Sequence, residues 1–298
     1  MTNSAYLCAQ MNIPVELLNL ITLNVGFARH HADWNWQGVS SPFTRFFLVT
    51  EGRAWLHLPE GRVELRPGYA YIVPAYTQHS YECDGEFALY YLHVYEGFKN
   101  VTDVFDIYEF PTEVKADALC EALFASVCRA YPDAGLPASN PLSYDNGSSL
   151  RDLVGKYGEL SLHERMELRA FSLMIFARFL SQARPRVWTQ DERIMRTLRY
   201  IGDHLNEHIG MDDLAAVSCV AKSYLIRLFT SALHVSPIRY VNRKKIERAQ
   251  LMLMTESVQV KEVAYRLGFD DHSYFIRLFR QIAGLTPNEY RRRYGYKA

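Results

Sequence analysis

The pattern of hydrophobic and polar positions divides the chain into a strand-rich front and a helical back. Within residues 42–96, short segments rich in aromatic and β-branched residues are separated by Gly, Pro and acidic turns, which is typical of strands. The predicted strands are PFTRFFLV (42–49), RAWLHL (53–58), GRVELRP (61–67), YAYIVP (69–74) and FALYYLHVY (87–95). Because these segments are short and closely spaced, they predict a β-barrel or a sandwich.

The pattern changes to a helical period after Pro111. Residues 115–131 and 161–183 have apolar positions three and four apart, which predicts two helices with one apolar face each. Residues 131–149 between them are rich in Pro, Ser, Asn and Gly and predict a loop. A short polar segment then predicts a linker, and everything beyond Asp191 has the pattern of helices and turns.

The back of the chain contains an internal repeat. The segment SYLIRLF at 223–229 returns as SYFIRLF at 273–279. In each copy a short helix, a turn and a second helix with one apolar stripe follow in the same order, and Gly268 suits a left-handed turn in the second copy. Two helices joined by a tight turn form a helix-turn-helix unit, whose second helix can lie in the major groove of DNA.

The face opposite each apolar stripe carries side chains that can read base edges. Arg can bond to guanine, Ser and His can form hydrogen bonds, and Ile can contact a thymine methyl group. The candidate DNA-binding residues are Lys222, Ser223, Ile226, Arg227 and Thr230 in the first copy and His272, Ser273, Ile276, Arg277 and Arg280 in the second. Arg243–Lys245, Arg248 and Arg291–Arg293 are expected to contact phosphates.

The distribution of charge agrees with a DNA-binding back half. The whole chain has a formal net charge of +0, but residues 191–298 hold 18 Lys and Arg against 12 Asp and Glu. Residues 1–190 hold 15 against 21. A basic segment of this kind suits double-stranded DNA as a partner. The odd number of cysteines without CxxC spacing and the absence of a long apolar run predict a cytoplasmic protein that does not enter a membrane.

Three segments of the back half resemble the DNA-binding domain of AraC-type (arabinose-regulator-like) transcription factors. They are the two SY(L/F)IRLF segments, the run VAYRLGFDDHSYF (263–275) and the ending TPNEYRRRY (286–294). The resemblance covers residues 191–298 and implies seven helices, with recognition helices that start near Ala221 and Asp271. The first copy reads VSCVAKSY (217–224), without the glycine commonly found in that turn, which leaves the geometry of the turn open.

The front of the chain resembles the cupin barrel that often precedes this domain as a sensor. The segments that carry this resemblance are Trp34-Asn35-Trp36, the turn at 50–52 and GYAYIVP (68–74) leading to His79. The expected fold class is therefore α+β and multidomain. It comprises a cupin-like ligand-binding β-barrel (1–110), a helical dimerisation region (111–184), a linker (185–190) and an all-α DNA-binding domain with two helix-turn-helix units (191–298).

A small barrel can hold one small ligand against the inward-facing residues of alternate positions. Aromatic rings with polar tips suit a carbohydrate or a related metabolite. The candidate ligand-binding residues are Arg45, Trp55, His57, Tyr71, His79, Tyr91 and His93, with Trp34 and Trp36 closing the mouth. The alternative interpretation is that these rings are ordinary core.

The sequence is also compatible with two other functions. His57, His79 and His93 could form a metal site in a cupin enzyme fused to a DNA-binding module, or each could be a barrel histidine bonded to a neighbour. The barrel could also be empty and the regulator constitutive. No GxSxG, P-loop or GxGxxG motif occurs, so we expect no catalytic residue and no cofactor, and a protein that is not an enzyme.

The helix predicted at 161–183 bears on the oligomeric state. Its apolar stripe within residues 168–180 could pair with a second chain or pack on the barrel of its own chain. The family resemblance favours a homodimer, whose operator would contain two half-sites. The resemblance also implies a small-molecule effector, makes RNA polymerase a candidate partner, and favours activation as the sign of regulation.

Overall fold

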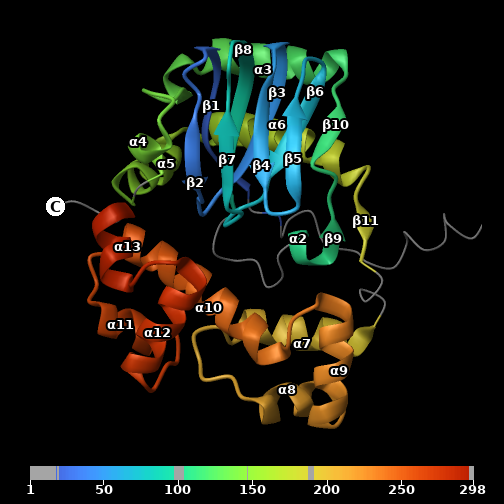
Figure 1. The fold of residues 1–298 in the computed structure, drawn as a ribbon, viewed down its shortest axis with the longest axis vertical. Coiled ribbons are helices and arrows are strands. Elements are labelled where there is room, and N and C mark those ends of the chain that lie inside the picture. The colour runs from blue at the N-terminus through green and yellow to red at the C-terminus, as the bar shows by residue number, and fades with distance from the viewer. Residues whose placement is uncertain (1–17, 19, 97–103, 146, 187–190, 295–298) are drawn as a thin grey trace, which may run out of the picture.

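The computed structural model describes residues 18, 20–96, 104–145, 147–186 and 191–294. Residues 1–17 with Cys8, and residues 187–190 of the predicted linker, lie outside these ranges. Figure 1 shows a β-rich half above and a helical half below. Among the described residues, no single helix is long and apolar enough to cross a membrane; Met211–Ser218 and Lys222–Leu233 pass that test only as a pair bent by 84°.

Two antiparallel sheets form the β-rich half, which we call the β-domain. The larger sheet has the order β1 (Leu20–His31), β8 (Glu86–Glu96), β3 (Thr44–Gly52), β6 (Tyr69–Val73) and β10 (Glu113–Lys115). The smaller sheet has the order β2 (Trp36–Val39), β7 (His79–Glu82), β4 (Ala54–Leu58) and β5 (Gly61–Leu65). The predicted β-barrel is thus formed by two facing sheets, without ladder hydrogen bonds that close a cylinder in the described part of the chain.

Alternation along the strands decides which side chains fill the space between the sheets. Phe47 on β3 and Leu89 on β8 point into this core, while Phe46 points to the opposite face. On β4 the inward positions are Ala54 and Leu56, both with no exposed area.

Strand β1 was not predicted from the sequence, because its inward face includes weak strand formers such as Asn24 and Gly26. The ring of Tyr91 from β8 lies over Gly26, and a Cβ atom at this position would be 2.3 Å from the Tyr91 hydroxyl oxygen. Cross-strand packing therefore stabilises a strand that local preference disfavours.

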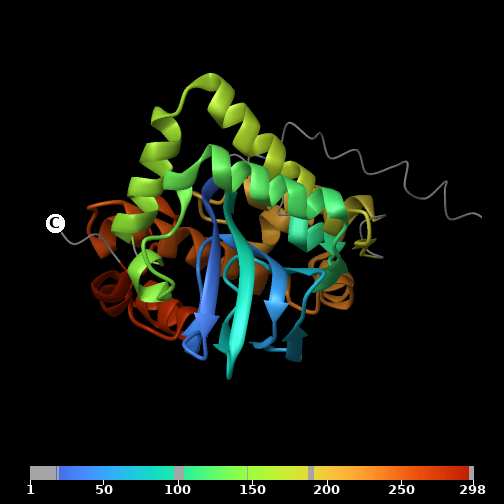
Figure 2. The ribbon, with the colours of Figure 1, turned by 90° about the horizontal axis from the view of Figure 1, so that it is seen from above.

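Two helices cover the outer face of the larger sheet (Figure 2). They are α3 (Ala118–Ala130) and α6 (Leu162–Leu180), close to the two predicted helices. The apolar stripe of α6, including Leu168, Phe171 and Ile175, is buried against this sheet, and Ser172 Oγ lies 2.7 Å from Thr22 Oγ1 of β1. The sequence allowed this stripe to pair with a second chain or to pack on its own chain. In the structure it packs on its own chain.

The predicted loop at 131–149 contains helical structure instead. A 3-10 turn (Pro132–Ala134) and the short helix α4 (Pro141–Tyr144) lie within it, and α5 (Gly147–Glu159) begins at its end. Helix α5 has two internal glycines and was not predicted; it is stabilised by packing on β1 and on the helical half. On the other side of the β-domain, α2 (Val104–Ile107) leads into β9 (Tyr108–Glu109), which pairs with β11 (Arg184–Pro185) at the start of the predicted linker (Figure 1).

Residues 191–294 form seven helices, the number that the family resemblance implies. They are α7 (Glu192–Asp203), α8 (Met211–Ser218), α9 (Lys222–Leu233), α10 (Pro237–Thr255), α11 (Val260–Arg266), α12 (His272–Ala283) and α13 (Pro287–Tyr294). We call α8–α9 the first unit and α11–α12 the second unit. Cys219 takes a left-handed conformation at φ 56°, close to the 66° of Gly268, so the first turn keeps its geometry without glycine.

The two units belong to different hydrophobic cores. Helices α7–α9 and the first turns of α10, including Tyr240, form one core. The rest of α10 and helices α11–α13 form a second core that also contains Leu23, Phe43 and Tyr95 of the β-domain, Tyr144 of α4 and Leu150 of α5. The second unit is therefore packed on the β-domain through one continuous core.

Candidate functional site

The predicted DNA-contacting face of α9 is exposed over its whole length. Leu225 and Phe229 are fully buried in the first core. The predicted residues on the other side are all exposed: Lys222, Ser223, Ile226, Arg227 and Thr230. The Lys222 ammonium lies 2.5 Å from the Asp212 carboxylate of α8, and the Arg227 guanidinium lies near the Tyr224 ring.

Helix α12 presents the equivalent face in the second unit. The Asp271 carboxylate accepts hydrogen bonds from the backbone N–H groups of Ser273 and Tyr274, so it caps the helix at the predicted start. Ser273, Arg277 and Arg280 are exposed, whereas His272 and Ile276 are half-buried. Both units therefore carry at least one arginine on an exposed recognition face.

One residue expected to contact phosphates is buried. Lys245 is 3 % exposed, and its ammonium donates to the carbonyl oxygens of Glu207 and Leu267. Arg291 donates to the carbonyl of Val258. The prediction of a phosphate contact is wrong for Lys245, because a run of basic residues does not show which of its members is buried.

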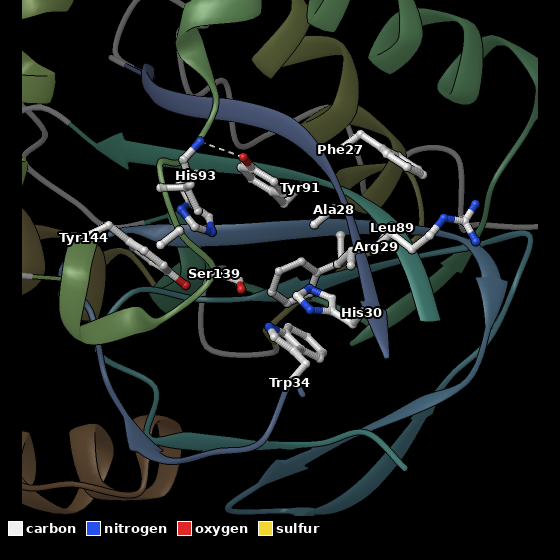
Figure 3. A pocket seen from close by; sticks show the side chains of 13 residues that line it. Phe27, Ala28, Arg29, His30, Trp34, Leu89, Tyr91, His93, Ser139 and Tyr144 are labelled. Carbon is white, nitrogen blue, oxygen red and sulfur yellow. Dashed lines mark hydrogen bonds between the residues drawn. The ribbon is translucent and has the colours of Figure 1, made fainter. Parts of the chain in front are cut away.

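A cavity of about 170 Å³ opens into the β-domain, and Figure 3 shows the side chains around it. Its walls come from β1, β3, β8, the β1–β2 connection and the segment that ends in α4. The lining residues are Phe27–His30, Trp34, Phe47, Leu89, Tyr91, His93, Leu136, Ala138, Ser139 and Tyr144. The Tyr91 hydroxyl accepts a hydrogen bond from the backbone N–H of Leu136, which ties this segment to β8.

His93 is the most unusual side chain of the cavity wall. It is 1 % exposed, its ring lies against Phe43 and Tyr144, and its Nδ1 has no hydrogen-bond partner in the protein. Burial, with Arg45 nearby, lowers the pKa of His93 well below 6.5, so the imidazole is neutral at pH 7. An unpaired buried polar atom of this kind favours a polar partner in the cavity.

Further polar groups lie beside His93 on the neighbouring strands. Asn24 and Arg45 are its cross-strand partners on β1 and β3. The Arg45 guanidinium lies 2.5 Å from the Asp145 carboxylate and donates to Ser41 Oγ, with both members of the ion pair buried. The Asn24 amide, Arg45 Nε and Asp145 Oδ1 have no hydrogen-bond partner in the protein.

The other end of the cavity is aromatic and carries no unpaired charge. The His30 ring stacks on Trp34 at 5.5 Å, and burial lowers the pKa of His30 even though Asp33 lies beside it. Arg29 at the mouth forms a two-bond ion pair with Glu51. A ligand would therefore meet flat rings, neutral imidazoles and hydroxyl groups.

Three of the nine predicted ligand-binding residues line this cavity: Trp34, Tyr91 and His93. Arg45 lies behind the wall in its ion pair with Asp145. His79 donates through Nδ1 to the Thr77 carbonyl and accepts at Nε2 from the Tyr81 hydroxyl, and burial lowers its pKa to about 3.

The remaining four predicted residues lie away from the cavity. Trp55 and His57 are on the outer face of β4, where Arg62 covers the Trp55 ring and His57 bonds to Glu82. Strand alternation separates the two faces of β4, but the inner face is that of Ala54 and Leu56, so the prediction for the aromatic face is wrong. The Tyr71 hydroxyl is bonded to the backbone of Glu64 and Arg66. Trp36 lies on the edge strand β2, where its cross-strand partner is Tyr81 of β7.

The structure does not bring the three histidines of the metal alternative together. His57 lies outside the sheet, and both nitrogens of His79 are bonded within the protein. Within the described ranges, no group of three or more His, Cys, Asp and Glu side chains could hold a metal ion.

Sequence reasoning missed two parts of the cavity wall. One is β1 with His30, and the other is the segment from Leu136 to Tyr144. The second lies far from the strands along the chain, so no local pattern places it over the sheet. The aromatic Tyr144 within a polar, turn-forming segment is the one signal that could have identified it.

Comparison with known proteins agrees with this arrangement. Residues 24–137 match the AraC-like ligand binding domain family, and residues 214–293 match a helix-turn-helix domain family. A probable transcriptional regulator, LumQ of Photobacterium leiognathi, is 24% identical over 94% of this chain and 98% of its own length. The arabinose operon regulatory protein of Salmonella typhimurium is 33% identical over 34% of this chain, a match limited to 36% of that protein.

The fold also has a counterpart among solved structures. ToxT of Vibrio cholerae aligns over 93% of this chain and 99% of its own, with a TM-score of 0.51 and 14% identity, which is a likeness of fold. The two family matches fall on the β-domain with its cavity and on the two helix-turn-helix units, and together they cover more than half of the chain. The chain is therefore a member of the AraC family, a ligand-responsive DNA-binding transcriptional regulator with an N-terminal ligand-binding domain and a C-terminal helix-turn-helix domain.

Proposed function

We propose that the exposed faces of α9 and α12 read two successive major-groove segments of one operator half-site. The proposal rests on the exposure of Arg227 and Arg277 at matching positions of the repeat. A bidentate contact between arginine and guanine contributes about 1–3 kcal/mol of discrimination. Basic side chains around the two faces add affinity that depends on salt.

Alanine substitution of each arginine tests this assignment. Arg227→Ala and Arg277→Ala should each weaken binding to a duplex selected by the parent protein by about tenfold, and each should relax the base preference at one position. Arg53→Ala, on the exposed surface of the β-domain, is the matched control. If both variants bind like the parent, these helices do not read DNA through their arginines.

The effector that the cavity supports best is a neutral, hydroxyl-rich molecule with a single ring, such as a monosaccharide. The unpaired Nδ1 of buried His93 is the observation that carries this assignment. A cavity of about 150 Å³ accommodates benzene, so about 170 Å³ suits one ring and not two. A charged ligand would find no free counter-charge among the lining residues, and a buried unpaired charge is strongly unfavourable.

Ligand-induced stabilisation tests the effector class. Neutral pentoses and hexoses are compared with the corresponding sugar acids and sugar phosphates by the melting temperature of the full chain. A ligand at one hundred times its Kd stabilises the folded state by about 2.7 kcal/mol, which raises the melting temperature by several degrees. We expect the rise for a neutral sugar, its loss in His93→Phe, and its retention in His57→Phe on the outer face. A rise only with charged ligands would contradict the assignment.

A ligand in the cavity would affect the packing of the second unit through the segment that ends in α4. Leu136 and Tyr144 line the cavity and also belong to the core that contains α10–α13. The Tyr76 hydroxyl of the β-domain donates to the Glu247 carbonyl of α10 as a second contact. A ligand that binds one arrangement of this shared core more tightly than another shifts the population of DNA-binding states.

The proposal extends to a cytoplasmic homodimer that activates transcription through RNA polymerase. Because the buried stripe of α6 packs on the larger sheet, a dimer contact would use exposed apolar residues of this helix, such as Leu162 and Met166. Met166→Glu should then shift the sedimentation coefficient from dimer to monomer. An unchanged dimer would place the contact elsewhere.

A further inference from the structure

Helix α10 lies between the two helix-turn-helix units and connects them (Figure 1). Tyr240 near its start belongs to the first core, and Ile246 and Ala249 further along belong to the second. A connecting helix by itself allows the two units to bend and twist relative to one another. The distance and angle between α9 and α12 therefore depend on contacts that join the units directly.

Lys245 lies on α10 where the two cores meet. Its ammonium donates to the Glu207 carbonyl, 2.5 Å away between α7 and α8, and to the Leu267 carbonyl, 2.6 Å away at the end of α11. The first acceptor precedes the first unit, and the second belongs to the turn of the second unit. One buried cation thus bonds to the backbone on both sides, and burial lowers its pKa to about 8.

Gly268 brings the same two backbones into contact. Its φ of +66° suits glycine, and a Cβ atom there would lie 2.3 Å from the carbonyl carbon of Glu207 and 2.5 Å from the His208 nitrogen. No side chain fits between the turn of the second unit and the segment that precedes the first. At the rim, His208 Nδ1 lies 3.5 Å from the Asp270 carboxylate, and both side chains are largely exposed.

We infer that Lys245 and Gly268 are positioning residues that join the two helix-turn-helix units into one rigid reader and thereby determine which operator spacing the protein accepts. The inference rests on the proposed function, in which α9 and α12 contact DNA together. One inserted base pair rotates the second contact segment by about 35° around the duplex axis. Two rigidly joined units cannot follow that rotation, whereas units whose contacts at Lys245 and Gly268 are loosened can.

The test measures affinity for three duplexes: the one selected by the parent from random DNA, and versions with one base pair added or removed between the two contact segments. The parent should lose at least about tenfold for each altered spacing. Lys245→Met, which keeps the apolar stem and removes the donor, should bind the selected duplex more weakly and lose only two- to threefold on alteration. Lys245→Arg should restore the discrimination, and Lys261→Met, on the exposed side of α11, should behave like the parent.

Other outcomes separate the two proposals. If Lys245→Met keeps the parent's spacing discrimination, or if the parent itself is insensitive to spacing, the inference is overturned even though DNA binding stands. If Arg227→Ala and Arg277→Ala bind like the parent, the proposed contacts fail instead. Gly268→Ala supplies the same comparison if Lys245→Met does not fold, as judged by near-UV circular dichroism.

Discussion

The buried ion pair between Arg45 and Asp145 is the most direct link between the larger sheet and α4. Its two side chains are 1 % and 4 % exposed, and the charged atoms are 2.5 Å apart. In Arg45→Met the carboxylate loses its counter-charge while it stays buried. Breaking a buried pair in this way costs about 3–5 kcal/mol of the free energy of unfolding.

The two single variants should differ in their response to pH. Burial raises the pKa of Asp145 even beside Arg45, so without Arg45 the carboxyl can take up a proton and remain in place. Loss of Arg45 raises the pKa of Asp145 further, so between the variant's value and the parent's the folded chain of Arg45→Met holds a proton that the parent does not. In this range its deficit relative to the parent shrinks as the pH falls, by up to about 1.4 kcal/mol per pH unit. In Asp145→Asn the guanidinium cannot lose its proton, so the deficit should stay nearly constant with pH.

Urea unfolding of the parent, both single variants and the double variant completes the test. Trp34 is buried against the cavity, and its fluorescence should report the transition. We expect the double variant to lose less than Arg45→Met alone, with a coupling energy of at least about 2 kcal/mol. A loss below about 1 kcal/mol in Arg45→Met, or full additivity in the double variant, would mean that the ion pair does not stabilise the fold.

Three further predictions concern stability. Cys219→Gly should raise the free energy of unfolding by about 0.5–1 kcal/mol, because glycine adopts the left-handed turn without strain; a decrease on calorimetry would count against this. Burial lowers the pKa values of His30, His79 and His93, so their contribution to stability is complete above about pH 6.5. As the pH falls below that value, each contribution decreases by up to about 1.4 kcal/mol per pH unit. A free energy of unfolding in urea that stays the same from pH 7 to 5 would contradict this prediction. Phe171→Ala on α6 should cost about 3–5 kcal/mol, since its ring is buried against the sheet and Phe124, and a loss below 1 kcal/mol would place the helix elsewhere.

The sequence predicted the helical half more completely than the β-domain for physical reasons. In α9 and α12 the apolar stripe, the repeated segment and the cap at Asp271 all point to the same helices, so each level of the pattern agrees with the others. In β4 the alternation is equally clear, but nothing local distinguishes the face of Leu56 from that of Trp55. Which face of a strand points to the core is decided by tertiary packing and not by the local sequence.

The cavity wall shows the same limit. His93 and Tyr91 follow from alternation along β8, because their strand is regular. Tyr144 could not be placed, since the segment that carries it is fixed by distant contacts: the Arg45–Asp145 pair and the bond from Leu136 to Tyr91. The burial of Lys245 depends on the carbonyls of Glu207 and Leu267, which only the fold brings together, so the basic run 243–245 alone could not show it.

We expect a neutral ligand in the β-domain cavity to change how the helix-turn-helix units bind DNA. The most direct measurement is the affinity for a selected operator duplex with and without the sugar that stabilises the protein most. A coupling free energy of 1–3 kcal/mol between two sites corresponds to a change of about 5–150-fold. We expect a change of at least fivefold that is lost in His93→Phe and kept in His57→Phe. An operator affinity that stays the same while the sugar still raises the melting temperature would contradict it.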